Sequence, residues 1–179
     1  MNMYYIALVA PEEINKAVLK WKYFLKEHFG CTAALKSPAH ITLIPPFWMD
    51  EELEKELIHS ITEFGKFRER FEISLKDFSA FNPKVIFVDV TKNEKLDSLY
   101  STFNEFIISQ NKYPVKIDER LFQPHVTIAT RDLYKKDYYE AWKIFAVKKF
   151  EARWMVNTIS LLRHNQKNWD VIFTSQFHQ

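Results

Sequence analysis

Hydrophobic and polar positions along the chain follow two periods, one of two residues and one of three to four residues. Alternation with a period of two, or a short apolar run, predicts a β-strand, and recurrence every three or four residues predicts an amphipathic α-helix. The pattern predicts strands over residues 3–10, 38–44, 71–76, 85–88, 123–130, 150–162 and 169–174. It predicts helices over residues 11–29, 50–64, 93–107 and 132–145. Both element types run through the whole chain, which indicates an α+β protein.

Glycine is rare in this chain, and the two glycines stand at informative positions. Gly30 and Gly65 each follow a run with helical periodicity, where a glycine commonly ends a helix in a left-handed conformation. Because the chain has no further glycine, it contains neither a Walker loop nor a Gly-x-Gly-x-x-Gly segment. If the protein handles phosphates, it must therefore bind them with side chains.

Two of the predicted strands carry the same short motif, His-x-Thr, within a β-branched apolar run. The first occurs as Pro-Ala-His-Ile-Thr-Leu and contains His40 and Thr42, and the second occurs as Pro-His-Val-Thr-Ile-Ala and contains His125 and Thr127. Successive side chains of a strand point to opposite faces, so each His shares a face with its Thr about 7 Å away. Each motif therefore places an imidazole beside a hydroxyl on one face of a sheet.

The order of elements repeats in the two halves of the chain. A strand over residues 6–9, a helix and the His40 strand correspond to a strand over residues 85–88, a helix and the His125 strand. Each motif is followed by a helix, a strand that opens Phe-Glu and a strand that contains Val-Ile-Phe. Such a repeat indicates an internal duplication, which ordinarily packs around a pseudo-two-fold axis. This axis would place the two His-x-Thr strands face to face.

Two histidines on opposite sides of a groove suit acid–base chemistry at a phosphate. A neutral imidazole can take a proton from water or a hydroxyl while a protonated imidazole gives a proton to the departing oxygen. The hydroxyls of Thr42 and Thr127 can donate to non-bridging phosphoryl oxygens and stabilise the charge of the transition state. The pattern does not decide which histidine is the acid, because a pseudo-symmetric groove can bind an asymmetric substrate in either direction.

The paired His-x-Thr motifs in a chain of 179 residues resemble the 2H phosphoesterase superfamily, which includes the 2′-5′ RNA ligase and 2′,3′-cyclic phosphodiesterase proteins. The resemblance covers most of the chain. It implies a bilobal α+β fold in which two sheets rich in antiparallel strands flank a central groove, with helices on the outside. It also implies that residues 1–179 form one domain whose lobes each contribute one motif.

The resemblance implies a function as well. It implies metal-independent action on 2′,3′-cyclic or 2′-5′ phosphodiesters of nucleotides or RNA, without a cofactor, a bound metal or an obligate protein partner. Matched residue by residue, it gives His40 and His125 as catalytic residues and Thr42 and Thr127 as phosphate-binding residues.

One position departs from the pattern of the superfamily. Many relatives carry an Arg directly after the Ala of the second motif, whereas here Thr130 takes that place and Arg131 follows it. On a continuing strand this shift of one residue would turn the Arg131 side chain to the opposite face. Arg131 is kept as a further candidate for substrate binding, together with Lys84, Tyr134 and Phe47, which lie near predicted strand ends.

Composition and charge limit the class of protein and its expected cellular location. The chain is 47% hydrophobic and 16% aromatic, which predicts a folded protein, and 25 basic against 23 acidic residues exclude a polybasic nucleic-acid-binding surface. Cys31 is the only cysteine, so neither an intrachain disulfide nor a Cys-based zinc site is possible. The apolar start of the chain is too short to span a bilayer. We expect a cytoplasmic monomer without membrane contact.

Two other classes of function remain open at this level. A catalytically silent protein could use the same groove to bind RNA ends or a phosphorylated metabolite, and ligand-induced thermal stabilisation without product would identify it. A metallohydrolase is the third hypothesis, and it predicts loss of activity with a chelator. Three further histidines are expected to be structural, with the last of them at a hairpin tip: His28, His59 and His164.

Overall fold

The computed structural model describes residues 1–116 and 120–178, and within them it contains two four-stranded antiparallel sheets. The first sheet has the strand order β2-β1-β7-β8 and the second has the order β5-β4-β3-β6. The strands of the first sheet are β1 (Asn2–Val9), β2 (His40–Met49), β7 (Thr158–His164) and β8 (Trp169–Gln176). Those of the second are β3 (Phe71–Phe81), β4 (Val85–Val90), β5 (His125–Ala129) and β6 (Glu151–Val156). The α+β prediction with two antiparallel sheets is thereby confirmed.

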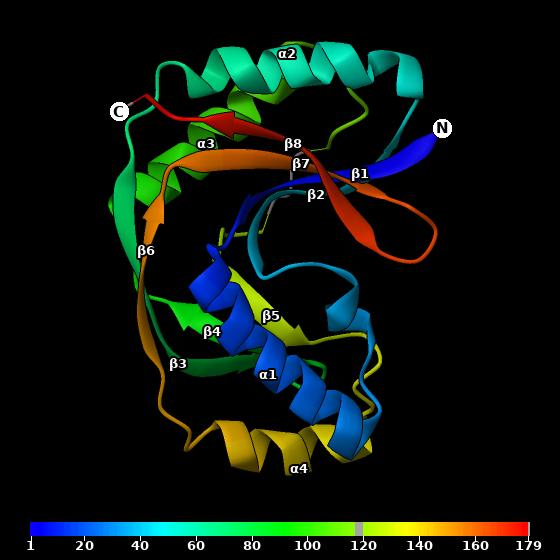
Figure 1. Ribbon diagram of the computed structural model, residues 1–179, viewed down its shortest axis with the longest axis vertical. Helices are drawn as coiled ribbons and strands as arrows, with labels where there is room; N and C mark the ends of the chain where they lie inside the picture. Colours follow the sequence, from blue (N-terminus) through cyan, green and yellow to red (C-terminus); the bar gives the residue numbers. More distant parts are fainter. Residues whose placement is uncertain (117–119, 179) are drawn as a thin grey trace.

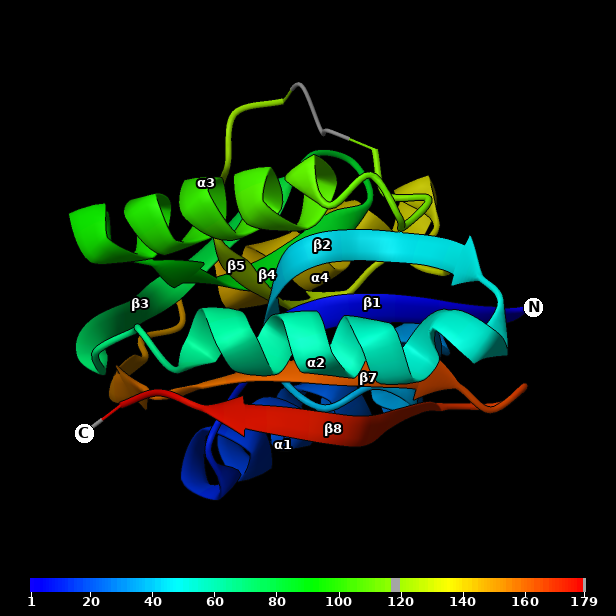
Figure 2. The same ribbon diagram turned by 90° about the horizontal axis from the view of Figure 1, so that it is seen from above.

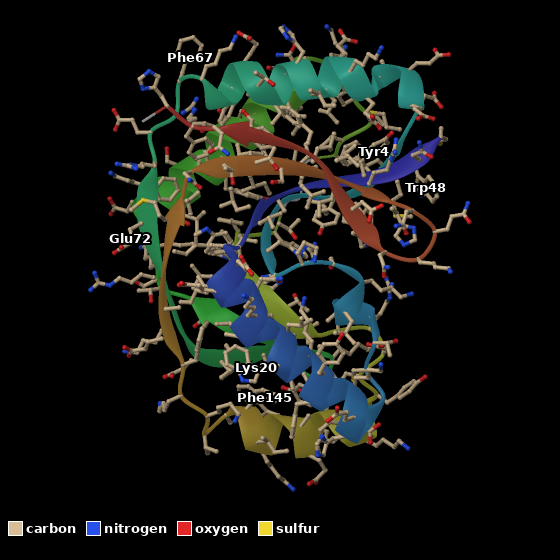
Figure 3. All side chains as sticks on the ribbon, viewed as in Figure 1. Tyr4, Lys20, Trp48, Phe67, Glu72 and Phe145 are labelled. Carbon is tan, nitrogen blue, oxygen red and sulfur yellow. The ribbon has the colours of Figure 1, made fainter. Side chains whose placement is uncertain are left out.

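The helices cover the outer faces of the two sheets. They are α1 (Glu12–Phe29), α2 (Glu54–Gly65), α3 (Glu94–Ser109) and α4 (Lys135–Phe145). Figure 1 places α2 and α3 beside the first sheet and α1 and α4 beside the second. Trp21 of α1 packs edge-on against Phe78 of β3 at 4.8 Å between ring centroids, and Phe24 packs against Phe145, which is labelled at α4 in Figure 3. Helix α1 therefore follows a strand of the first sheet in sequence but packs on the second sheet.

The registers of β2 and β5 are alike in the two halves of the chain. In the first sheet Val9 of β1 pairs with His40, and Ala7 pairs with Thr42. In the second sheet Asp89 of β4 pairs with His125, and Phe87 pairs with Thr127. Both motif strands are edge strands that contact one another, and the view from above shows β2 crossing over the second sheet (Figure 2). The fold thus brings the two motifs to a common groove.

The segment from residue 150 to residue 162 differs from its prediction. Its pattern predicts one long strand, but the segment is divided at Asn157 into β6 and β7. Strand β6 pairs with β3 in the second sheet, whereas β7 pairs with β1 in the first, so the chain passes from one sheet to the other. The carbonyl of Asn157 accepts a hydrogen bond from the backbone N–H of Phe177 at the crossing. Alternation reports which face is buried, but it does not report which sheet a residue joins.

The Val-Ile-Phe strands also differ from their prediction. Residues 85–87 lie in β4, directly beside the motif strand β5, whereas residues 171–173 lie in β8 at the far edge of the first sheet. Two strands, β1 and β7, separate β8 from β2. The strand that takes the place of β4 in the first sheet is therefore β1. The two Val-Ile-Phe segments also differ in burial, because Ile86 and Phe87 are buried whereas Val171 is exposed.

The two glycines have different structural roles. Gly30 has φ 71° and its N–H donates to the carbonyls of the last turn of α1, which confirms the predicted left-handed cap. Gly65 is the final residue of α2 and is followed by right-handed helical backbone, so the same prediction is wrong for it. A Cβ at residue 65 would collide with the hydroxyl of Ser175 in β8. Gly65 is therefore needed for the close approach of α2 to the sheet.

The predicted start is correct for helix α3 but not for helix α4. The Asn93 side chain accepts a hydrogen bond from the N–H of Leu96, which confirms the predicted start of α3. Helix α4 begins at Lys135 rather than at Asp132. The Asp132 carboxylate instead accepts hydrogen bonds of 2.7 Å from the backbone N–H groups of Thr32 and Ala33. Asp132 therefore contacts the segment after α1 and does not belong to α4.

Candidate active site

A groove between the two sheets contains both His-x-Thr motifs. Its larger part has a volume of about 690 Å³ and is lined by Thr42, His125 and Thr127, among other residues. Its smaller part has a volume of about 230 Å³ and is lined by Thr42, His40 and Thr127, among others. The two parts are continuous through four shared residues, which are Thr42, Pro46, Thr127 and Thr130. All four residues of the motifs therefore line one groove, with one histidine in each part.

The two imidazoles are oriented by the same local hydrogen bond. Nδ1 of His40 lies 2.7 Å from the carbonyl oxygen of Pro38, and Nδ1 of His125 lies 2.7 Å from the carbonyl oxygen of Gln123. A carbonyl can only accept, so Nδ1 is the donor in each ring and a neutral ring keeps its lone pair on Nε2. In each neutral ring Nε2 can therefore accept a proton.

Each imidazole also packs against aromatic rings. The ring centroid of His40 lies 4.9 Å from that of Tyr5, which in turn packs edge-on against Trp169. The His125 ring lies 5.0 Å from the rings of both Phe81 and Phe87. These contacts restrict the rings to one orientation and reduce their access to water.

Burial disfavours the charged form of both histidines. The pKa of His40 is lowered to about 4, first by burial and then by the positive charges of Lys22 and His125, against an opposing effect of the Pro38 carbonyl. The pKa of His125 is also lowered by burial, while the Gln123 carbonyl and the Asp89 carboxylate act in the opposite direction. Both rings are accordingly neutral near pH 7 in the free protein, and a bound anion would favour their protonation.

The threonine hydroxyls of the motifs are available to a ligand. Thr42 and Thr127 are half-buried and line both parts of the groove. Among the residues that the structure describes, neither hydroxyl has a hydrogen-bond partner. Two hydroxyl donors and two Nε2 atoms around one volume form a set that can bind a phosphodiester and move protons at it.

Lys22 was not identified as a candidate from the sequence, yet it lines the smaller part of the groove with His40. Its side chain is only 3% exposed, and Nζ donates a hydrogen bond of 2.9 Å to the carbonyl oxygen of Ser37. Burial lowers the pKa of Lys22 to about 8. One signal was present in the sequence, because Lys22 falls among the apolar residues Val18 and Leu25 on the buried face of α1.

Arg131 lies closer to the site than the strand pattern suggested. Strand β5 ends at Ala129, so the alternation of faces does not extend to residue 131. Arg131 lines the smaller part of the groove together with His40. The departure from the superfamily pattern therefore leaves a guanidinium at the groove.

The remaining candidates lie away from the two parts of the groove. Lys84 is exposed in the turn between β3 and β4, Tyr134 is exposed before α4, and Phe47 is 7% exposed and packs against Tyr4 in the core. Trp48 and Phe67, labelled in Figure 3, lie at the outer margin of the molecule. The groove is lined by other aromatic side chains, namely Phe81, Tyr100 and Phe122.

The loop over residues 112–122 reaches the groove at its end. Leu121 and Phe122 line the larger part, and the Phe122 ring stacks on Tyr100 at 3.8 Å between centroids. Residues 117–119 of this loop lie outside the described residues. The stacked pair offers a flat apolar wall beside His125.

The other histidines do not line the groove. Nδ1 of His28 is bonded to the Phe24 carbonyl, and His59 is exposed on α2. His164 is the last residue of β7 and contacts Trp169, which confirms its place at a hairpin end. Within residues 1–116 and 120–178, no cluster of three or more His, Cys, Asp or Glu side chains could hold a metal ion. In the same residues, no helix has the length and apolar character needed to cross a membrane.

Comparison with known proteins finds relatives that match most of the chain. The family model described as the 2′-5′ RNA ligase superfamily matches residues 10–168. Two proteins that carry phosphoesterase names are similar along most of their length. One, from a Geobacillus species, is 25% identical over 174 residues and covers 96% of this chain and 94% of that protein. The other, from Staphylococcus epidermidis, is 27% identical over 177 residues, with 94% and 95% covered.

Solved structures share the fold at lower identity. The crystal structure of Escherichia coli LigT complexed with 3′-AMP has a TM-score of 0.69 and 17% identity, with 99% of both chains covered. A protein from Thermus thermophilus has a TM-score of 0.71 and 16% identity, with 98% of this chain and 97% of that chain covered. The three proteins therefore share the same overall fold.

Proposed function

The chain belongs to the 2′-5′ RNA ligase superfamily, and on this basis we propose that it is a metal-independent phosphodiesterase that acts on 2′,3′-cyclic or 2′-5′ phosphodiesters of nucleotides or RNA. The observation that carries this proposal is the pair of imidazoles in one groove, each with Nδ1 bonded to a backbone carbonyl. The superfamily supports a phosphoesterase, and the groove supports the two-histidine mechanism.

The reaction requires one proton to be removed and one to be supplied. For a 2′,3′-cyclic phosphate, Nε2 of one histidine takes a proton from water while the water oxygen forms a bond to phosphorus. The bond between phosphorus and one ribose oxygen breaks, and that oxygen receives a proton from Nε2 of the other histidine. The product is a phosphate monoester with a free ribose hydroxyl.

The other side chains of the groove would bind the phosphate and the nucleoside. The hydroxyls of Thr42 and Thr127 donate to the non-bridging oxygens, where negative charge increases in the transition state. The phosphate charge raises the pKa of both histidines above their values in the free protein, so that one of them can carry the acidic proton. The stacked rings of Tyr100 and Phe122 provide a surface against which a base can stack.

A panel assay in the presence of a chelator tests this function. The substrates are 2′,3′-cyclic nucleotides, an RNA with a cyclic phosphate end and a 2′-5′-linked dinucleotide. We expect turnover by the native protein, and a loss of about 10²–10⁴-fold in both His40→Ala and His125→Ala. His59→Ala is the matched control, because His59 is exposed on α2 outside the groove.

Three results would count against the proposal. Full activity in either active-site variant would exclude the two-histidine mechanism, and activity abolished by the chelator would indicate a metallohydrolase. Ligand-induced thermal stabilisation without any product would point to a protein that binds RNA ends or a phosphorylated metabolite.

A further inference from the structure

The pseudo-symmetry of the groove is broken by a buried cation beside His40. The buried face of α1 contains Lys22 among Ile14, Val18 and Leu25. The corresponding face of α3 is entirely apolar, with Leu96, Leu99, Phe103 and Ile107 buried. Burying a lysine is unfavourable, and no acidic side chain is present among the described residues that line its part of the groove. Only one half of the protein therefore places a buried lysine of its helix beside its histidine.

The same short segment holds Lys22 and His40 in place. Nζ of Lys22 donates to the carbonyl of Ser37, and Nδ1 of His40 donates to the carbonyl of the next residue, Pro38. Both side chains line the smaller part of the groove. The ammonium group and the imidazole are thus fixed relative to one another by consecutive carbonyl groups.

An anion breaks the symmetry at the other histidine. Directly opposite residues of an antiparallel pair project to the same face of the sheet, so Asp89 lies on the face that carries His125. At the equivalent register position in the first sheet, the residue opposite His40 is Val9, which has no charge. A carboxylate therefore accompanies His125 but not His40.

The remaining titratable and charged groups near the two histidines do not cancel the difference in charge between Lys22 beside His40 and Asp89 beside His125. The smaller part of the groove adds Tyr5 and Arg131 beside His40, and burial holds the pKa of Tyr5 far above neutral pH. The part that contains His125 adds Arg120. An Arg is thus found at both ends, so Lys22 and Asp89 supply the unequal charges.

We propose that Lys22 and Asp89 assign the roles of the two histidines, with His40 as the general base and His125 as the general acid. This assignment rests on the proposed function. Lys22 and Asp89 act as positioning residues, since they determine where the single proton of the histidine pair resides. A cation disfavours the protonated form of His40, and an anion favours the protonated form of His125.

The pKa directions agree with this geometry. Lys22 is among the causes that lower the pKa of His40, and Asp89 acts to raise the pKa of His125. In the reaction, Nε2 of His40 receives a proton from water as the new oxygen–phosphorus bond forms. Nε2–H of His125 gives its proton to the ribose oxygen as the old bond breaks, and both rings then exchange protons with solvent.

The pH dependence of kcat/KM tests the assignment. A general base determines the acidic limb of the profile and a general acid determines the basic limb. Lys22→Met should move the acidic limb to higher pH by on the order of one unit, and Lys22→Arg should restore it. Asp89→Asn should move the basic limb to lower pH.

Lys20→Met, on the exposed side of α1 (Figure 3), is the control and should move neither limb. A shift of the basic limb in Lys22→Met would overturn the assignment.

An activated leaving group gives a second kinetic test. A nucleotide 4-nitrophenyl phosphodiester releases a weakly basic phenolate, which departs without a general acid. We expect His125→Ala to regain most of its activity on this ester, whereas His40→Ala stays inactive. Recovery of His40→Ala in place of His125→Ala would reverse the two roles.

Titration of the two rings by ¹⁵N NMR separates this inference from the proposed function, because it requires no turnover. With saturating inorganic phosphate, His125 should become protonated at a higher pH than His40. Lys22→Met should reduce the difference between the pKa values of the two rings. Protonation of His40 first would overturn the assignment even in an active enzyme. The expected order in a protein without turnover would retain the charge asymmetry while the proposed function failed.

Discussion

At the scale of single residues, the sequence could predict the candidate residues that lie within the His-x-Thr motifs, because strand alternation determines which side chains share a face. His40 with Thr42 and His125 with Thr127 each share a strand face, and the structure places all four in the groove. Lys22 escaped prediction because a lysine within helical periodicity normally extends its charge to solvent, whereas the Lys22 side chain is only 3% exposed. Arg131 was misplaced because alternation was extended beyond the end of β5.

The threonine hydroxyls give a prediction at this scale. Thr42→Val and Thr127→Val keep the side-chain shape but remove the donor to a non-bridging oxygen. Each should reduce kcat by about 10–10³-fold with a smaller change in KM, because the charge on that oxygen grows in the transition state. Steady-state kinetics with Thr62→Val as the control measures this, since Thr62 bonds within α2. Unchanged kcat in both motif variants would remove the threonines from the site.

At the scale of elements, the sequence located helices and strands well but not the contacts between them. The division of residues 150–162 at Asn157 arises because β6 and β7 join different sheets, and β8 lies at the edge of the first sheet. Those choices depend on the partner strands, and the alternation within a segment does not encode them. Gly65 shows the same limit, because its role depends on Ser175 in a distant strand.

The contact of α2 with β8 gives a prediction of stability. Gly65→Ala should lower the free energy of unfolding by about 1–3 kcal/mol, because its methyl group collides with the Ser175 hydroxyl. The double variant Gly65→Ala, Ser175→Ala should recover much of this loss in urea denaturation. Gly30→Ala is the contrasting case, since open space surrounds it and its cost of about 1 kcal/mol comes from φ 71°. If the double variant is no more stable than Gly65→Ala alone, the collision with Ser175 is not the cause of the loss.

At the scale of the whole molecule, the duplication predicted that the two motifs would meet. Strand β2 contacts β5, and Thr42 and Thr127 line both parts of the groove. The sequence alone could not assign the packing of α1 on the second sheet, because the helix is amphipathic whichever sheet it covers. That packing brings Lys22 of α1 to the His40 end of the groove. The chemical asymmetry of the site is thus a product of the overall fold.

Burial of the histidines makes the stability of the whole protein depend on pH. Because the folded pKa of His40 is about 4 against an ordinary value of 6.5, the unfolded chain binds more protons between these values. This contribution to stability is present above pH 6.5 and is lost as the pH falls toward 4. Urea denaturation across this range should show a shallower pH dependence for His40→Gln than for the native protein. An identical dependence would show that His40 is not buried as a neutral ring.

The two-histidine mechanism is tested most directly by measuring kcat/KM for hydrolysis of a 2′,3′-cyclic nucleotide, with chelator present, in the native protein, His40→Ala and His125→Ala. We predict turnover in the native protein and a loss of about 10²–10⁴-fold in each variant, with circular dichroism showing native folding. Hydrolysis by either variant at the native rate would contradict the mechanism.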